Sequence, residues 1–436
     1  GDTNTNPLAI TFPTASSYPT KSVAINFVHT FNPRVQNEAR VGFLRTVWHQ
    51  GLPKDTTGAF GSSGNSVVGI AGGNSTEGFS AQSVTNLTTI GNAATYSDNA
   101  MNNFTYEDNL TVQKGAHIIK MGAQFIRYQQ NSVYTGNDGA QGTLTYNGNF
   151  TTGTGATIPG YLATGYAIAD FYLDRVYSAG RGTLAGHTGQ RQWRDAVFVQ
   201  DDWKISPTFT ANLGMRWEFD QPIYEVNNKE ANLNLSTGAV QIAGQNGNSR
   251  ALYNAVWTNF MPRVGFSWNP KPRFVLRGGF GTTTYLEGTG ANLRLTINPP
   301  FQSSISFTGA APTAGNTGSS TTAETGFSSN SATCAYSTNP ACGQLFRAWD
   351  RNLRPSTVQA VSLTTEYQLS NTSSVQVGYV NEYAYHLIQA VNGNQLSTPC
   401  FSSTGALLAY NSAACFAVNK SPFYQQVGQS GFVRIT

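Results

Sequence analysis

One stretch of the chain, TFTANLGMRWEF from Thr208 to Phe219, alternates strictly between two kinds of side chain. Every odd position from Phe209 onward is apolar, and every even position is polar or glycine. Successive side chains of a β-strand point to opposite faces, so the stretch predicts a strand with one apolar and one polar face. A helical period of 3.6 residues does not fit it. The apolar face could turn toward lipid or toward the core of a soluble two-layer sheet, and the way the pattern recurs has to separate these alternatives.

Short turns and long connections follow one another along the chain. Each short turn has the Gly, Pro or Asn that a tight reversal needs, and the turns fall at Asn32-Pro33, Lys114-Gly115, Ser206-Pro207, Asn269–Pro272 and Ser370-Asn371. Between the resulting hairpins lie long polar connections at roughly 50–97, 131–190, 220–260 and 286–356. A compact soluble domain rarely carries structureless loops beyond about 15 residues. Alternation of short and long connections is typical of outer-membrane barrels, with short turns on the periplasmic side and long loops outside.

The alternating pattern recurs in the segments that border these turns. It is clear in 116–128, 273–281, 357–369 and 373–380, and weaker in 21–48. In the strand after each turn, a polar residue and a glycine two positions later share the polar face: Arg40 and Gly42, Lys120 and Gly122, Asn212 and Gly214, Arg277 and Gly279, Gln376 and Gly378. Glycine there would let the strand coil or let another body pack close to the wall. With 45 glycines in the chain, chance repetition is the alternative.

The composition agrees with an all-β chain. Charged residues make up 11% of the 436 residues, against about 25% in an ordinary soluble domain, and Gly, Ser, Thr and Asn take their place. No run approaches the roughly 18 apolar residues of a transmembrane helix. A net charge of +4 without a basic cluster gives no support for nucleic-acid binding. The chain starts at Gly1 without a signal peptide, so we expect a processed or truncated piece.

Aromatic residues gather at the ends of the predicted strands: Trp48, Trp203, Trp217, Tyr128, Tyr285 and Tyr367. In a membrane barrel they would form the girdles at the two interfaces. In a soluble protein they would be core residues, and the positions alone do not distinguish the two.

The four cysteines form two close pairs in turn-rich segments, Cys334 with Cys342 and Cys400 with Cys415. A zinc site would favour CxxC spacing with histidines nearby, and neither is found. The spacing therefore predicts two local loop disulfides formed in an oxidising compartment.

No pattern of catalytic or metal-binding residues is recognisable. The five histidines are scattered without HxxxH or HExxH spacing, no GxSxG occurs, and the glycine-rich segments do not open a helix. Asp201 and Asp202 resemble a carboxylate pair, but adjacent strand residues face opposite ways and cannot share a substrate; we expect polar contacts at the membrane edge. The sequence predicts no enzyme, no metal and no cofactor.

Polar-face side chains of the predicted strands are the candidate site. They could line a polar lumen and grip a plug or a solute, although any solvated strand face carries such charges. The candidates are Lys120, Gln124, Asn212, Arg216, Glu218, Arg277 and Glu366.

Two hairpins resemble those of TonB-dependent receptors, in particular the Oar-like barrel proteins. DAVFVQDDWK at 195–204, followed by LGMRWEF at 213–219, resembles the family hairpin "FxQDdW … LnLGlRyE". FMPRVGFSWN at 260–269 with LRGGFG at 276–281 resembles the next, "FxPRvGfaW … lRgGyG". The resemblance covers about 21–390, and the two motifs are specific in combination.

The resemblance implies an antiparallel transmembrane β-barrel in the bacterial outer membrane, in contact with membrane lipid. It also implies import of a scarce, unidentified ligand, gated by a plug domain and driven by the TonB complex. Such transporters have about 22 strands, whereas the sequence shows about 11 to 13 and neither a plug nor a TonB box. We therefore expect residues 1–436 to be part of one barrel domain, with the plug and the remaining strands absent.

Two other functions remain open at this point. One is a secreted, soluble all-β protein whose loops bind glycans or surfaces, and the less favoured one is a passive porin. The fate of the apolar face of 209–219, toward lipid or toward a protein core, distinguishes the soluble protein from the barrel.

Overall fold

The structure is a computed structural model. It describes the chain except residues 1–8, 71–76, 94–96, 137, 153–164, 183–185, 235–236, 286–294, 303, 313–317, 328–345, 393–400, 409–431 and 436. No helix in the described residues is long and apolar enough to cross a membrane.

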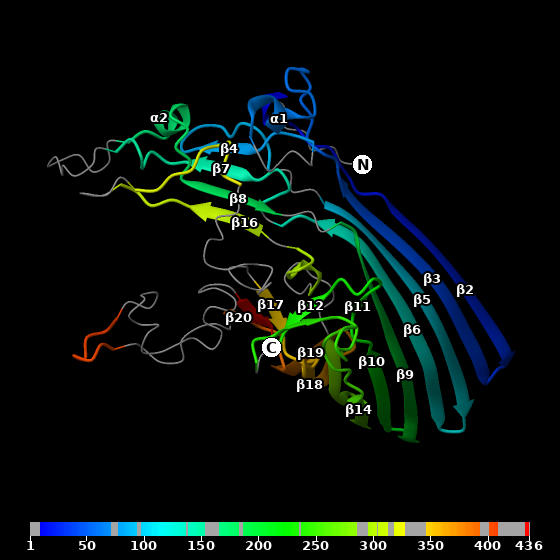
Figure 1. Cartoon of the computed structure of the whole chain (residues 1–436). Coiled ribbons are helices and arrows are strands. Elements are labelled where there is room, and N and C mark those ends of the chain that lie inside the picture. Colours follow the sequence, from blue (N-terminus) through cyan, green and yellow to red (C-terminus); the bar gives the residue numbers. More distant parts are fainter. Residues whose placement is uncertain are drawn as a thin grey trace.

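A single twelve-stranded antiparallel sheet dominates the molecule (Figure 1). Two of its members, β1 (Ser16–Ser17) and β11 (Tyr224–Glu225), are two-residue strands. The others are 12 to 19 residues long, and each pairs with its neighbour in the chain: β2 (Thr20–Asn32), β3 (Val35–Gln50), β5 (Ser97–Lys114), β6 (His117–Tyr134), β9 (Thr188–Ser206), β10 (Phe209–Asp220), β14 (Asn259–Lys271), β15 (Phe274–Tyr285), β18 (Ser356–Ser370) and β19 (Ser373–Tyr385). This architecture confirms the predicted all-β fold of antiparallel strands.

All five predicted short turns join consecutive long strands. The β5–β6 turn shows the local chemistry, because Gly115 adopts a φ of 61°, which side chains rarely tolerate. The long connections also fall where the sequence predicts them, between β3 and β5, β6 and β9, β10 and β14, and β15 and β18. Short and long connections therefore lie at opposite ends of the sheet.

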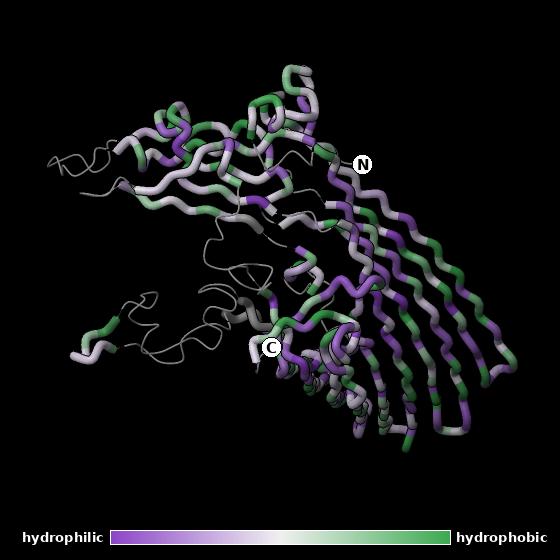
Figure 2. The backbone as a smooth tube through the Cα atoms, in the orientation of Figure 1, coloured by the Kyte–Doolittle hydropathy of each residue, from purple (hydrophilic) through white to green (hydrophobic). Residues whose placement is uncertain are grey.

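The predicted alternation of faces is present in β10. We call the face that carries Leu213 and Met215 the apolar face, and the face that carries Asn212 and Arg216 the polar face. Leu213 and Met215 are each 43% exposed, so no described part of the chain covers the apolar face at these positions. A soluble two-layer protein would have buried them. Figure 2 shows the same alternation of apolar and polar residues along the neighbouring long strands.

The sheet is open in the described residues. The edge strand β2 pairs only with β3, and the edge strand β19 only with β18. All residues of β2 are exposed, and so are those of β19 except the last. Both faces of each edge are therefore uncovered.

The long connections carry secondary structure of their own, which the alternation pattern did not predict. Four short strands form a second sheet in the order β16 (Ser304–Thr308), β8 (Ser178–Gly182), β7 (Thr143–Tyr146) and β4 (Ala81–Val84). The helices α1 (Gly64–Val68) and α2 (Ala167–Tyr172) lie beside it (Figure 1). Buried apolar side chains, among them Phe12, Leu144 and Tyr146, form its core.

A smaller group of elements comes from the later connections. It contains the hairpin of β12 (Ala231–Leu233) and β13 (Val240–Ile242), and the sheet of β17 (Phe346–Trp349), β21 (Phe432–Ile435) and β20 (Ala390–Asn392). Two 3₁₀ turns, η1 (Ala9–Thr11) and η2 (Leu295–Ile297), complete the described elements. The buried apolar residues of the molecule thus gather mainly in the connections rather than in the wall of long strands.

Candidate functional site

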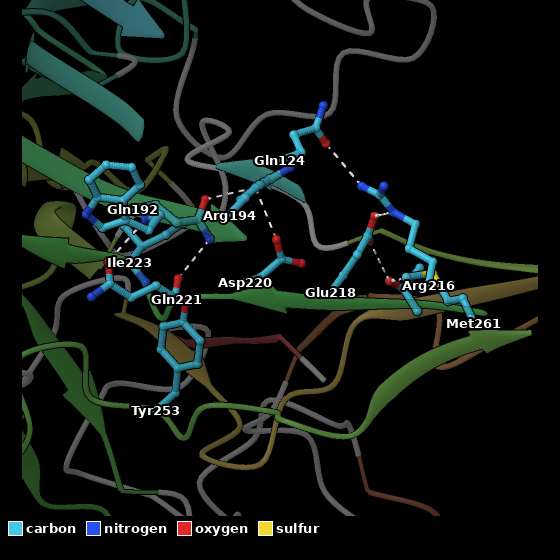
Figure 3. Close-up of polar contacts among 12 residues, drawn as sticks. Gln124, Gln192, Arg194, Arg216, Glu218, Asp220, Gln221, Ile223, Tyr253 and Met261 are labelled. Carbon is cyan, nitrogen blue, oxygen red and sulfur yellow. Dashed lines mark hydrogen bonds and ion pairs between the residues drawn. The ribbon is translucent and has the colours of Figure 1, made fainter. Parts of the chain in front are cut away.

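A chain of hydrogen bonds crosses the polar face from β5 to β15. Gln124 donates through Nε2 to a carboxylate oxygen of Glu107 and accepts at Oε1 from Nη2 of Arg216, 3.0 Å away. Arg216 also pairs through Nε with Glu218, and Thr284 donates to the other oxygen of Glu218 at 3.2 Å. Figure 3 shows Gln124, Arg216 and Glu218 converging on one another. We call these five residues the polar-face network.

A second polar group lies beside this network, toward the end of the sheet that carries the long connections. Arg194 Nε is 3.4 Å from Asp220 Oδ1 and donates to Gln192 Oε1 at 3.2 Å (Figure 3). Its guanidinium carbon lies 4.9 Å from the centre of the Tyr128 ring. The two groups together line a hollow of about 200 Å³. Such convergent donors and acceptors can hold a polar solute or a polar segment of protein.

The structure places the seven sequence-predicted residues in three groups. Gln124, Arg216 and Glu218 belong to the polar-face network. Asn212 and Lys120 meet at Asp202, with Asn212 Nδ2 at 2.7 Å and Lys120 Nζ at 3.9 Å from its carboxylate oxygens. The remaining pair, Arg277 and Glu366, stands apart with 3.7 Å between Nη1 and Oε2.

Sequence reasoning missed Glu107, Asp202 and Thr284 as members of these groups. Glu107 lies in a stretch of β5 that is polar on both faces, so its alternation gives no face assignment. The register supplies it, because Glu107 pairs directly with Gln124.

Glycine occurs on the polar face for two different reasons. A Cβ on Gly122 would lie 2.8 Å from the Phe198 ring, so this chain itself requires the glycine. A Cβ on Gly214 would lie 3.6 Å from its nearest neighbour and one on Gly281 3.9 Å, which are ordinary contacts. Nothing within the described chain excludes a side chain at these two positions.

Arg263 stands between Gly214 and Gly281, its direct partners on β10 and β15. In the next row, Gly265 pairs with Gly279. No described side chain pairs with the Arg263 guanidinium, and the surrounding shelf forms a hollow of about 390 Å³. Within the described residues, the shelf thus combines glycine backbone that is open to close contact with an unpaired guanidinium group.

Asp201 and Asp202 point to opposite faces, as predicted. Asp202 contacts Asn212 on the polar face, whereas Asp201 Oδ2 lies 2.7 Å from His117 Nδ1 on the apolar face. Both make polar contacts, and they share no site.

One long connection contains a buried pair of carboxyl groups. Glu225 accepts three backbone N–H groups, from Gly189, Asn227 and Lys229, at 2.6–2.9 Å. Glu230 is 2% exposed. Burial, reinforced by the nearby charge of Glu225, raises the pKa of Glu230 well above its usual range. Glu225 therefore ties the connection to Gly189 of β9, and both carboxyl groups lie away from the polar-face network.

In the described residues, no group of three or more His, Cys, Asp or Glu side chains is arranged to hold a metal ion. Cys334, Cys342, Cys400 and Cys415 lie outside the described residues, so their pairing stays a prediction.

Comparison with known proteins gives one match over nearly the whole chain. A family model described as an outer membrane beta barrel domain matches residues 1–434. No curated protein matches the chain.

Similar solved structures include the outer membrane transporter YddB from Escherichia coli. It has 9% sequence identity and a TM-score of 0.44, and the match covers 91% of this chain and 37% of that chain. A mutant of the ferric enterobactin receptor PfeA from Pseudomonas aeruginosa has 11% sequence identity and a TM-score of 0.34, and the match covers 100% of this chain and 49% of that chain. The ferric-catecholate import receptor Fiu from E. coli K12 has 12% sequence identity and a TM-score of 0.36, and the match covers 91% of this chain and 43% of that chain. The chain spans less than half the length of each of these three proteins.

Proposed function

The chain belongs to the outer membrane beta barrel domain family, and on that premise we propose that it forms part of the wall of a TonB-dependent, Oar-like receptor. In this proposal the full-length protein imports a scarce ligand across the bacterial outer membrane. Residues 1–436 would then be part of one barrel domain, and the remaining strands of that barrel, together with a separate plug domain, would come from the rest of the full-length protein. The apolar face meets lipid, and the polar face lines the lumen.

The polar face is the observation that carries the proposal. Its charged side chains are linked across strands by the polar-face network, while Leu213 and Met215 on the opposite face are exposed and apolar. A barrel wall between lipid and a polar interior needs this combination. The two hairpins that resemble Oar-like receptors are β9–β10 and β14–β15, and they lie side by side because β10 pairs with β14.

The shelf around Arg263 supports a plug within the lumen. Among the described residues, Gly214 and Gly281 have room for side chains. A plug that packs closely against the wall would explain why these positions are glycine. Arg263 would then meet an acidic group of that body. The seven predicted residues Lys120, Gln124, Asn212, Arg216, Glu218, Arg277 and Glu366 would face the same interior.

The plug can be tested by photo-crosslinking in cells that produce the full-length receptor. A photoreactive amino acid replaces Ala360, the partner of Gly281 in the Arg263 row, and in a control replaces the adjacent Val361 on the apolar face. We expect position 360 to capture a segment of the same polypeptide outside 1–436, and position 361 to capture lipid. Absence of a protein adduct at 360 would remove the plug from the proposal.

TonB dependence needs a separate measurement. The purified full-length receptor should bind the isolated periplasmic domain of TonB and should show no steady ion conductance in a planar bilayer. A passive porin would show the reverse, with conductance and no TonB binding.

A further inference from the structure

A small charged cluster occupies the apolar face beside the β5–β6 turn. Lys114 pairs in register with His117, and His117 pairs with Trp203. Trp203 pairs in turn with Ala211, an odd-numbered residue of β10, which places the whole row on the apolar face. Asp201 lies on the same face one rung further from the turn, opposite Leu213.

The contacts within this cluster fix the imidazole ring. His117 Nδ1 is 2.7 Å from Asp201 Oδ2, and its ring stacks on Trp203 with 5.2 Å between the centroids and 20° between the planes. The His117 side chain is still 39% exposed. Because Nδ1 is engaged, the open edge of the ring carries Nε2. A protonated ring can donate from Nε2 to an outside group while Nδ1–H stays on Asp201.

Lys114 adds a second donor on the same row. It is exposed, and no described side chain pairs with it. Charge on the lipid face of a barrel is costly at the midplane but is tolerated near the interface, and Lys114 and His117 flank the Gly115-Ala116 turn directly. These side chains therefore lie at the level of the lipid headgroups on the side of the short turns.

We propose that Lys114, His117 and Trp203 form a binding site for the phosphate of a phospholipid in the periplasmic leaflet of the outer membrane. Lys114 Nζ donates to the phosphate oxygens in a charge-assisted hydrogen bond, which is among the strong ones. His117 adds a second donor at Nε2 when both ring nitrogens carry hydrogen. The Trp203 indole, 37% exposed, packs against the glycerol region, where amphipathic aromatic rings are favoured. Asp201 is a positioning residue that holds the imidazole.

Inorganic phosphate presents the same oxygens to the two donors. The surroundings favour the lipid, because the neighbouring apolar-face residues Val112, Ile119 and Ala211 would contact acyl chains and offer nothing to a free ion.

The test uses the full-length receptor, purified in detergent and stripped of lipid, with native mass spectrometry to count adducts. Dihexanoyl-phosphatidylglycerol and inorganic phosphate are titrated separately. The double variant Lys114→Gln/His117→Gln should bind the lipid about ten-fold more weakly, as expected for the loss of a charged hydrogen bond. Lys271→Gln is the matched control, because Lys271 also sits beside a short turn, pairs with the apolar-face residue Phe274, and has no described side-chain partner. It should bind like the wild type.

The variant Asp201→Asn tests whether Asp201 acts by positioning the His117 imidazole or only by stabilising the fold. It should weaken lipid binding less than the double variant does, and Asp201→Glu should restore it, with unchanged heat-dependent gel mobility of the barrel in all variants. Equal lipid binding by the wild type and the double variant would overturn the site. Equal loss in the Lys271→Gln control, or binding of inorganic phosphate as tight as that of the lipid, would overturn the assignment of a specific lipid site.

Discussion

The wall of long strands and the structures in the long connections use apolar side chains in opposite ways. In the wall, Leu213 and Met215 point outward and are exposed. In the four-stranded sheet of the connections, Leu144 is completely buried and packs in a cluster with Phe12 and Tyr146. The wall therefore depends on lipid as its apolar solvent, whereas the connection sheet makes a core of its own as soluble domains do.

The comparison predicts that damage to one region spares the other. Leu144→Ala removes a fully buried side chain from the connection sheet and should destabilise that sheet by about 2–5 kcal/mol. Barrel assembly in the outer membrane should stay at the wild-type level, because no wall strand contributes to this cluster. Limited proteolysis of intact cells should show faster cutting within 135–187. Loss of assembled receptor would mean that the two regions fold as one unit.

The wall should respond to charge on one face only. Val361→Arg places a guanidinium on the apolar face between Phe280 and Asn381, which costs about 2–4 kcal/mol near the bilayer midplane. Ser362→Arg, one residue away on the polar face, should cost little. The amount of each variant recovered from purified outer membranes measures the difference.

Leu213 is a weaker position for the same test. Its direct partner on β9 is Asp201, which could pair with an arginine introduced there.

Equal recovery of Val361→Arg and Ser362→Arg would contradict the face assignment.

The cysteines test whether the connections are further stabilised in the oxidising environment outside the cell. Chain entropy predicts about 2–3 kcal/mol for each small disulfide ring. Peptide mapping without reductant should find Cys334 joined to Cys342 and Cys400 joined to Cys415. Cross-pairing or four free thiols would refute this arrangement.

The smallest effect concerns pH. Because the folded pKa of Glu230 is raised above its unfolded value of 4.5, the folded state binds more protons in the window between the two values. The contribution of Glu230 to the stability of the 221–258 connection is therefore fully present below about pH 4.5 and is lost as pH rises through the folded pKa, by at most about 1.4 kcal/mol per pH unit. Glu230→Gln should flatten this dependence in hydrogen exchange. An unchanged slope would show that Glu230 is not its source.

The sequence predicts the wall far better than the connections, and the reason is physical. Each wall strand lies between lipid and a polar interior, so its environment repeats every two residues and is written in the sequence, as in Phe209–Phe219. The short turns are equally local, because Gly115 or Pro207 carries the signal alone.

The connection sheet has no such period. Its strands β4 and β7 have four residues each and pair Ala81 with Thr143, far apart in the chain. Their contacts are set by tertiary packing. The candidate site was predicted in part for the same reason: Arg216 and Gln124 follow from alternation, whereas Glu107 joins them only through the register of β5 with β6.

The environment of Leu213 gives the most direct test of a wall that stands between lipid and a polar interior. In outer membranes containing the full-length receptor with Leu213→Cys, a lipid-soluble maleimide should label the cysteine and a water-soluble maleimide should not. Asn212→Cys on the polar face serves as the control and should resist the lipid-soluble reagent. Labelling of position 213 by the water-soluble reagent, or by neither reagent, would show that the apolar face meets water or protein instead of lipid, and the assignment of the wall to the membrane would be wrong.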